Sequence, residues 1–417
     1  MKWTDTAHGW AVAVIACAFC CAQAQAADLK LSQALLSAAT THPSVQVRVA
    51  EIQAAGKEVD AAKWGRFPTA SVQATSSDGQ PQAALVLQQP LWVGGKVDAQ
   101  IRFSEATLLQ AEAALHEARQ NALLQTSNGF FEVLRLRERL ALARSNEAEH
   151  KKLLDLIDRR VLAEISPVAD LTLARARMQQ AISDRIQFDR ALQNALLTLD
   201  QWVGPQAGQA KAPVRIDSEP LGADRLITSA KEYSGELRRL RHQVEVAQAQ
   251  VVIAESNLWP GLYVTHRHGL GGPGYVTQTA KNQTFLSLNI TPGAGLSAAA
   301  QAQAAKARIE TANQGIETYS RQLEQQVRNN MAEWSALKEQ QVSSRELVQA
   351  TADVVDSYLR QYQLGRKNWL DVLNALRESV QAAYTAADID YGIVSAQLRL
   401  MLFSGQLNLD NLQLIHD

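Results

Sequence analysis

The hydrophobic period of the chain changes at Pro68. Before it, residues 31–64 carry apolar side chains every three or four positions, which predicts a helix that tolerates Pro43 near its start. After it, residues 69–76 alternate between apolar and polar side chains. This alternation predicts a half-buried strand, so a helix-to-strand transition is expected at Pro68.

A second strand and a very long helix follow. Turn-forming residues at 76–81 lead into a strand candidate at 82–92, which Gly94 and Gly95 end. From there to residue 165 the chain has no proline and one glycine, which predicts a helix of about 100 Å at 1.5 Å per residue. Such a helix needs a partner helix along its length.

The same succession then appears a second time. A break at 163–170 and a returning helix to residue 202 close the first copy. The second copy has the same parts in the same order: a helix at 221–258, strands at 260–268 and 283–290, a proline-free stretch, a break at 362–371 and a helix to residue 403. The chain is therefore predicted to be an internal duplication.

The spacing of the helix and strand breakers supports this duplication. Pro68 and Pro260 are 192 residues apart, and Asp170 and Asp371, each just after a break, are 201 residues apart. We expect a signal peptide at 1–26, a first repeat at 27–203 and a connector at 204–220. A second repeat at 221–404 and a C-terminal tail at 405–417 follow.

The N-terminal segment has the pattern of an export signal. Lys2 precedes a short apolar run at 10–19, and small residues at 22–26 offer a cleavage site after Ala26. All three cysteines, Cys17, Cys20 and Cys21, lie inside this segment, so the mature chain would contain none. Residues 14–17 also resemble a lipoprotein cleavage box, which leaves lipidation of Cys17 as the alternative.

Charge and hydropathy limit the possible environments. The formal net charge of −1 gives no strong field toward nucleic acid. Beyond residue 25 no apolar run approaches the ~20 residues of a membrane-spanning helix, so membrane insertion would have to use strands. Four strands cannot close a barrel, and an open sheet edge is not tolerated in lipid. Three chains would supply twelve strands, within the range of outer-membrane barrels.

This arrangement resembles the TolC family of outer-membrane efflux and secretion ducts. The resemblance is carried by "FP" at 67–68, "WP" at 259–260, "QPLWVGGKVDAQ" at 89–100, and the two breaks at 161–171 and 361–373. It implies a mainly helical fold with a small membrane β-barrel, assembled as a homotrimer in the outer membrane with a helical tunnel in the periplasm. It also implies an inner-membrane adaptor and a transporter as partners. The helix–strand transitions would be formed by Phe67, Pro68, Gly94, Gly95, Trp259 and Pro260.

The resemblance also assigns roles at the two breaks, which it makes the periplasmic tips. Asp371 falls on an acidic ring of the gate and Asn374 on the next, usually acidic, ring position. Asp170, Tyr362 and Lys367 fall on the positions of contacts that lock the closed end. Both aspartates could instead cap the returning helices. Adaptor docking would use tip residues Leu162, Glu164, Ser166, Leu364, Gly365 and Arg366; Glu164 stands where the first tip usually has glycine.

Other kinds of function find less support in the residues. No catalytic constellation or nucleotide-binding glycine loop appears, so we expect neither enzymatic activity nor a cofactor. His266 and His268 have a metal-like spacing, but two histidines are an incomplete site, and we expect a solvated pair near a barrel rim. A periplasmic helical rod or adaptor without a barrel is the alternative, and it predicts loops at 69–92 and 260–290. The nature of the cargo is left open.

Overall fold

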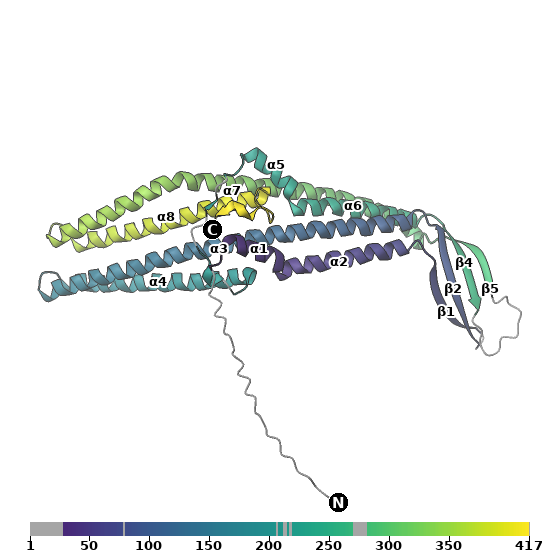
Figure 1. The fold of residues 1–417 in the computed structure, drawn as a ribbon, viewed down its shortest axis with the longest axis horizontal. Coiled ribbons are helices and arrows are strands. Elements are labelled where there is room, and N and C mark those ends of the chain that lie inside the picture. The colour runs from purple at the N-terminus through teal and green to yellow at the C-terminus, as the bar shows by residue number, and fades with distance from the viewer. Residues whose placement is uncertain are drawn as a thin grey trace, which may run out of the picture.

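The molecule is an elongated bundle of helices with a small sheet at one end (Figure 1). The structure is a computed structural model, and it describes residues 28–77, 80–205, 207–211, 215–216, 219–269 and 282–416. The expected signal peptide, Cys17 and the expected turn between the third and fourth strands lie outside the described residues. No helix in the described part of the chain has both the length and the apolar character needed to cross a membrane.

The two repeats contain helices of matching length. The first repeat has helices of 11, 22, 67 and 36 residues: α1 (Leu31–Thr41), α2 (Pro43–Trp64), α3 (Lys96–Leu162) and α4 (Val168–Val203). The second repeat has the same four lengths: α5 (Ala223–Tyr233), α6 (Gly235–Ser256), α7 (Ser297–Gln363) and α8 (Trp369–Ser404). At 1.5 Å per residue, α3 and α7 are each about 100 Å long, as the sequence predicted.

The first helix of each repeat is divided in two, which the prediction of single helices at 31–64 and 221–258 missed. His42 has an extended backbone before Pro43, and its Nδ1 accepts a hydrogen bond from the Ser44 amide. Ser234 has the same role in the second repeat, where its Oγ accepts from the Leu237 amide. In both cases a side chain caps a new helix start, which ends the preceding helix.

The four strands form one antiparallel sheet in the order β1-β2-β4-β5. The strands are β1 (Thr69–Ser77), β2 (Gln80–Trp92), β4 (Gly261–Gly269) and β5 (Asn282–Asn289). The strands β1 and β2 extend into the segment 76–81 that was predicted as a turn. Central strands β2 and β4 join the repeats, and β1 and β5 are open edges.

The register gives the sheet two chemically different faces. Val72 pairs with Leu85, Leu85 with His268, and Val264 with Leu286, so these residues share a largely apolar face. The other face is mostly polar, with Thr69, Ser71, Gln73, Gln88, Thr265, Gln283 and Ser287. Residues 69–74 of β1 are exposed on both faces, so the half-buried strand that was predicted there is not found. The reason is that no other described part of the chain forms a second layer over this sheet.

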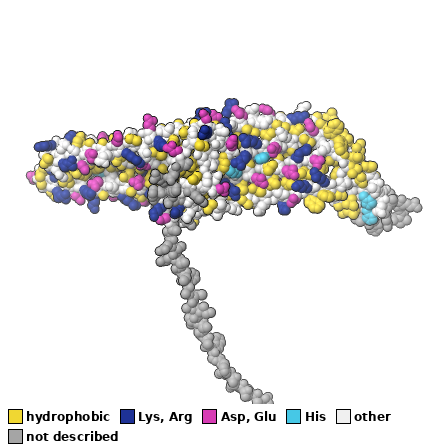
Figure 2. All heavy atoms as spheres, turned by 45° about the horizontal axis from the view of Figure 1, so that its top comes forward, with side chains coloured by type: hydrophobic (Ala, Val, Ile, Leu, Met, Phe, Trp, Pro, Cys, Tyr) yellow, Lys and Arg dark blue, Asp and Glu magenta, His cyan; other side chains and the backbone are white. Residues whose placement is uncertain are grey.

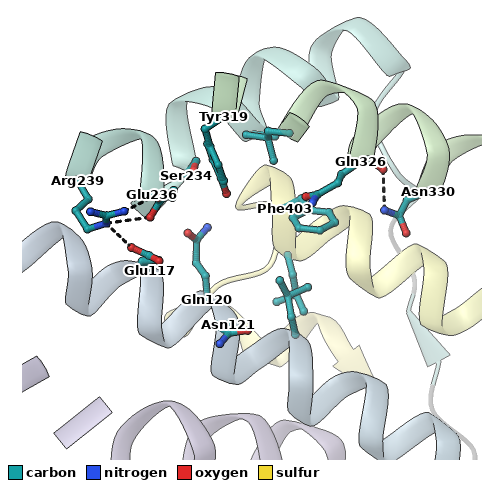
Figure 3. A pocket seen from close by; sticks show the side chains of 14 residues that line it. Glu117, Gln120, Asn121, Ser234, Glu236, Arg239, Tyr319, Gln326, Asn330 and Phe403 are labelled. Carbon is teal, nitrogen blue, oxygen red and sulfur yellow. Dashed lines mark hydrogen bonds and ion pairs between the residues drawn. The ribbon is translucent and has the colours of Figure 1, made fainter. Parts of the chain in front are cut away.

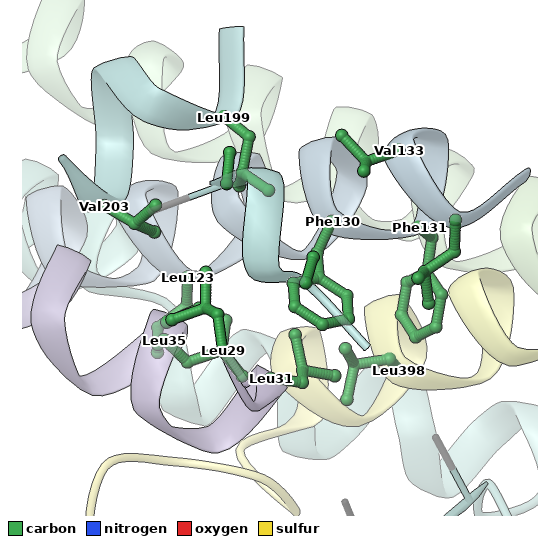
Figure 4. Close-up of a cluster of buried hydrophobic side chains, with 14 of the residues drawn as sticks. Leu29, Leu31, Leu35, Leu123, Phe130, Phe131, Val133, Leu199, Val203 and Leu398 are labelled. Atoms are coloured by element: carbon green, nitrogen blue, oxygen red, sulfur yellow. The ribbon is translucent and has the colours of Figure 1, made fainter. Parts of the chain in front are cut away.

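The main core lies midway along the helical body, where α1, α3, α4 and α8 meet (Figure 4). Phe130 of α3 is fully buried there, and Leu31, Leu35, Leu199 and Leu398 pack in the same cluster. The connector and the C-terminal tail meet at this level too: β3 (Arg215–Ile216) pairs with β6 (Ile415–His416). The connector and the C-terminal tail are thus held at the centre of the bundle.

Candidate functional site

The two helical hairpins, α3/α4 and α7/α8, end at the same end of the molecule, opposite the sheet (Figure 1). Their turns have the same backbone hydrogen bonds: the amides of Ala163 and Leu364 each bond to a carbonyl four residues earlier. Glu164 then has φ 57° and Gly365 has φ 71°. Both residues have a left-handed backbone conformation, which glycine adopts freely and which is strained for glutamate. The two tips are therefore copies of one turn, with a less suitable residue in the first.

Tyr362 links the two tips within one chain. Its side chain is only 5% exposed, and its hydroxyl lies 3.3 Å from the Ser166 hydroxyl of the first tip. Arg160 donates to that same Ser166 oxygen at 3.3 Å and places its guanidinium 4.8 Å from the centre of the Tyr362 ring. Trp369 packs on the ring as well, with 5.4 Å between ring centres. Arg160 and Trp369 were not predicted from the sequence, because both act through residues outside their own helices.

The start of α8 is capped by Asn368, and not by Asp371 as the alternative interpretation had it. The Asn368 Oδ1 accepts a hydrogen bond of 2.8 Å from the Asp371 amide. Asp371 is thus in the first helical turn, where its charge favours the helix dipole. On α4, the N-cap position is Pro167, so Asp170 does not cap either. The signal for this cap was present in the sequence, since asparagine three residues before an acidic residue is a known helix start.

The expected gate and locking residues are only partly brought together. Lys367 Nζ lies 3.7 Å from an Asp371 carboxylate oxygen and 4.2 Å from the centre of the Tyr358 ring. Within the described residues, no side-chain partner is found for Asp170 or Asn374. Several expected docking residues are freely accessible; Leu162 is 78% exposed and Leu364 is 70% exposed.

Aromatic and glycine residues lie where the helices meet the sheet. Gly94 and Gly95 have φ of 61° and 78°, and a Cβ on Gly94 would lie 3.2 Å from the Trp259 Cβ. Trp92 and Trp259 meet edge to face at 6.5 Å. Phe67 packs on Trp64. Figure 2 shows hydrophobic side chains over this end of the molecule and charges of both signs over the helices.

His266 and His268 lie on the apolar face of the sheet, paired in register with Leu87 and Leu85. Each uses its ring Nδ1 in a cross-strand hydrogen bond, His266 to the Thr284 hydroxyl at 2.8 Å and His268 to the Asn282 side chain. Among the described residues there is no group of three side chains that could hold a metal ion. The Nδ1 of each histidine is therefore bonded to a side chain of β5.

A polar pocket of about 470 Å³ lies near the middle of the body, between α3, α5, α6, α7 and α8 (Figure 3). Arg239 Nε bonds to Glu117 at 2.9 Å and to Glu236 at 3.0 Å. Burial and the neighbouring Glu236 carboxylate raise the pKa of Glu117 to about 7, against the attraction of Arg239. Burial also acts to raise the pKa of Glu236, but hydrogen bonds from Glu117 and Arg239 outweigh it and lower that pKa. The site can titrate near neutral pH.

A four-stranded amphipathic sheet that continues into helices of about 100 Å is the architecture of an outer-membrane duct. The relatives of the chain agree with this class. A sequence model of the outer membrane efflux proteins matches residues 21–205 and 226–406. The chain therefore belongs to the outer membrane efflux protein family.

Curated relatives match over most of their length. The outer membrane protein TolC of Salmonella enteritidis is 21% identical, over 91% of this chain and 82% of that protein. The cobalt-zinc-cadmium resistance protein CzcC of Cupriavidus metallidurans is 26% identical, over 79% of this chain and 81% of that protein. The alkaline protease secretion protein AprF of Pseudomonas aeruginosa is 25% identical, over 80% of this chain and 71% of that protein.

Solved structures share the fold. The outer-membrane channel OprN has a TM-score of 0.79 at 17% identity, with 90% of this chain and 89% of that chain covered. The outer membrane protein VceC of Vibrio cholerae has a TM-score of 0.76 at 18% identity, with 90% and 96% covered. The predicted family, fold class and outer-membrane channel function are thus confirmed. The alternative of a rod with loops at 69–92 and 260–290 is wrong, because these segments contain the sheet.

Proposed function

We propose that three copies of this chain form a closed duct through the outer membrane, with twelve strands in one barrel. The observation that carries the proposal is the pair of open edges, β1 and β5. An open edge in lipid leaves backbone amides and carbonyls without partners, so β1 of one copy must pair with β5 of the next. The apolar face of the sheet then meets lipid and the polar face lines the lumen.

The helical body has two corresponding free sides. Within the chain, α3 contacts α8, which joins the two hairpins, whereas α4 and α7 lie on the outer sides. Exposed apolar residues lie on both of these helices, including Leu197 on α4 and Leu347 on α7. A ring of three chains would place α4 of one copy beside α7 of the next and cover these side chains. The same rotation that joins β1 to β5 would thus build the tunnel below the barrel.

The partners in this proposal are an inner-membrane adaptor, which docks at the tips, and a transporter, which supplies energy. Leu162, Leu364 and Leu370 are exposed apolar residues at or next to the turns and suit such docking. Relatives differ in the cargo that their names state, which is metal ions for CzcC and a protease for AprF. The names of the relatives therefore do not identify the cargo of this chain.

The gate is proposed to be a ring of three Asp371 carboxylates at the narrow end, followed by three Asn374 amides. A ring of like charge in a narrow passage attracts cations and disfavours anions. Lys367, 3.7 Å from Asp371, offsets part of this charge within each chain. Asp371→Asn should therefore reduce the cation selectivity of single channels in planar bilayers. Unchanged selectivity would place the gate elsewhere.

Assembly and docking are tested separately. Cross-linking of the protein in detergent should trap trimers from the outer-membrane fraction, and a stable soluble monomer would contradict the proposal.

Leu364→Asp should abolish transport while trimers still form, because the change lies at the tip and far from the edges of the sheet. Its control is Leu296→Asp, a similarly exposed leucine at the sheet end of α7, which should leave docking intact.

A further inference from the structure

Arg267 is the only arginine or lysine in the four described strands. Tyr263, His266 and His268 are the other ionisable groups of these strands, and no aspartate or glutamate occurs in them. Asp78 and Lys281 lie between strands in the sequence, outside the described residues. Arg267 is exposed, and within the described residues its guanidinium has no ion-pair partner. Its charge is therefore not cancelled by the sheet.

The register places Arg267 on the polar face. It pairs with Val86 of β2 and Gln283 of β5, and Val86 pairs in turn with Ser71 of β1. Its neighbours in sequence, His266 and His268, point to the opposite, apolar face, because successive side chains alternate in a strand. Two buried residues, Ala84 and Thr265, also belong to the polar face. The guanidinium thus stands on the same side of the sheet as Ser71, Thr265 and Gln283.

We propose that Arg267 of each of three chains forms a ring of positive charge inside the barrel, which makes Arg267 a determinant of selectivity for anionic cargo. This inference rests on the proposed trimer, since the polar face becomes a lumen only in a closed barrel. Fixed guanidinium groups raise the local concentration of anions and lower that of cations. The electrostatic potential of these groups extends about 10 Å from the barrel wall at 0.1 M salt and about 30 Å at 0.01 M, which are the screening lengths at these ionic strengths. Cargo with carboxylate, phosphate or sulfate groups is favoured at this end of the duct.

The absence of cysteine from residues 22–417 makes a direct test possible. Gln283→Cys places a thiol beside Arg267 on the same face, and Leu286→Cys places one on the opposite face of the same strand. In the signal-processed protein, in lipid vesicles, each thiol is treated with an anionic and a cationic methanethiosulfonate of similar size. The ratio of the two reaction rates, divided by the same ratio for a small free thiol in solution, measures the local potential and does not depend on conduction through the tips.

We expect the thiol of Gln283→Cys to react with both reagents, with an anion-to-cation rate ratio above that of a free thiol. We expect Leu286→Cys to be protected by lipid. Adding Arg267→Gln should lower the anion-to-cation rate ratio about three- to tenfold at 0.01 M salt, and less at 0.5 M. Arg267→Lys should keep the ratio, because it keeps the charge. An unchanged ratio in Arg267→Gln, with Gln283→Cys still reactive, would overturn the proposal and leave the duct intact. Equal reactivity of Gln283→Cys and Leu286→Cys would overturn the barrel itself, and the proposal with it.

Discussion

The long helices α3 and α7 have the same length and the same place in their repeats, yet they are buried very differently. Much of α3 is buried along its length, including Phe130, Phe131 and Leu134, because α2, α4, α6 and α8 surround it. Most of α7 is exposed, and Leu347 is 52% exposed. Equal backbones with unequal surroundings leave α7 with a largely uncovered face, which a second chain would cover in the proposed trimer.

A second difference between the repeats concerns the backbone itself. Among the described residues, two that are not glycine have positive φ, Glu164 and Leu296. Each has a glycine with positive φ 201 residues away in the other repeat, Gly365 for Glu164 and Gly95 for Leu296. Both repeats thus have the same left-handed backbone at these positions. Only one of the two repeats has glycine there, the residue that adopts this backbone without strain. The duplication preserves backbone shape more strictly than side-chain identity.

The largest expected effect is a difference in stability between two variants, one with a side chain removed from α3 and one with a side chain removed from α7. Phe130→Ala should destabilise the protein by about 3–5 kcal/mol, because a fully buried aromatic side chain is replaced by a cavity. Met331→Ala, at the equivalent position of α7 and only partly buried, should cost about 1–2 kcal/mol. Thermal unfolding of both variants in detergent measures this difference. Equal losses would contradict the view that α3 alone is at the centre.

The exposed face of α7 should matter for assembly more than for folding. Leu347→Glu should weaken trimers by about 2 kcal/mol, because a charge replaces a leucine that a neighbouring chain would bury. Ala352→Glu, on another side of the same helix, serves as the matched control and should leave assembly unchanged. Size-exclusion chromatography at falling protein concentration compares the two. Trimers that resist Leu347→Glu would show that this face is not an interface.

The pocket at Glu117 should give the protein a pH dependence that the second repeat lacks, since Thr318 stands at the equivalent position. The pKa of Glu117 is about 7 in the folded protein against an ordinary 4.5, so the folded state binds the extra proton between these values. Stability should therefore fall as the pH rises from 4.5 through 7. Glu117→Gln should remove this part of the slope in thermal midpoints measured between about pH 5 and 8. If the thermal midpoint of Glu117→Gln still falls with rising pH, the pH dependence comes from other groups.

The smallest effects are expected at the two tips. Glu164→Gly should raise stability by up to about 1 kcal/mol, because glycine adopts the left-handed backbone without strain. Gly365→Ala should lower it by about 1 kcal/mol for the opposite reason. Melting temperatures of the two variants, measured side by side, decide this. A loss of stability in Glu164→Gly would mean that the glutamate side chain stabilises the tip.

Much of the fold could be predicted from the sequence because it is encoded locally. Pro68 and Pro260 block helix continuation, the alternation at 69–76 marks a strand, and the long proline-free stretches mark the helices. The divisions at His42 and Ser234 and the cap at Asn368 were local as well, but their signals were not recognised. A fold made of two copies of one local pattern is well suited to such analysis.

Only the tertiary structure decided which distant residues meet. Ser166 and Tyr362 come together across 196 residues, and Glu117 meets Glu236 and Arg239 through the crossing of α3 and α6. The pairing of β2 with β4 places Arg267 beside Val86, on the polar face. Periodicity reports which side of its own element a residue occupies, but not which element lies opposite. Burial, charge neighbours and pKa shifts depend on that second element, and therefore on the folded chain.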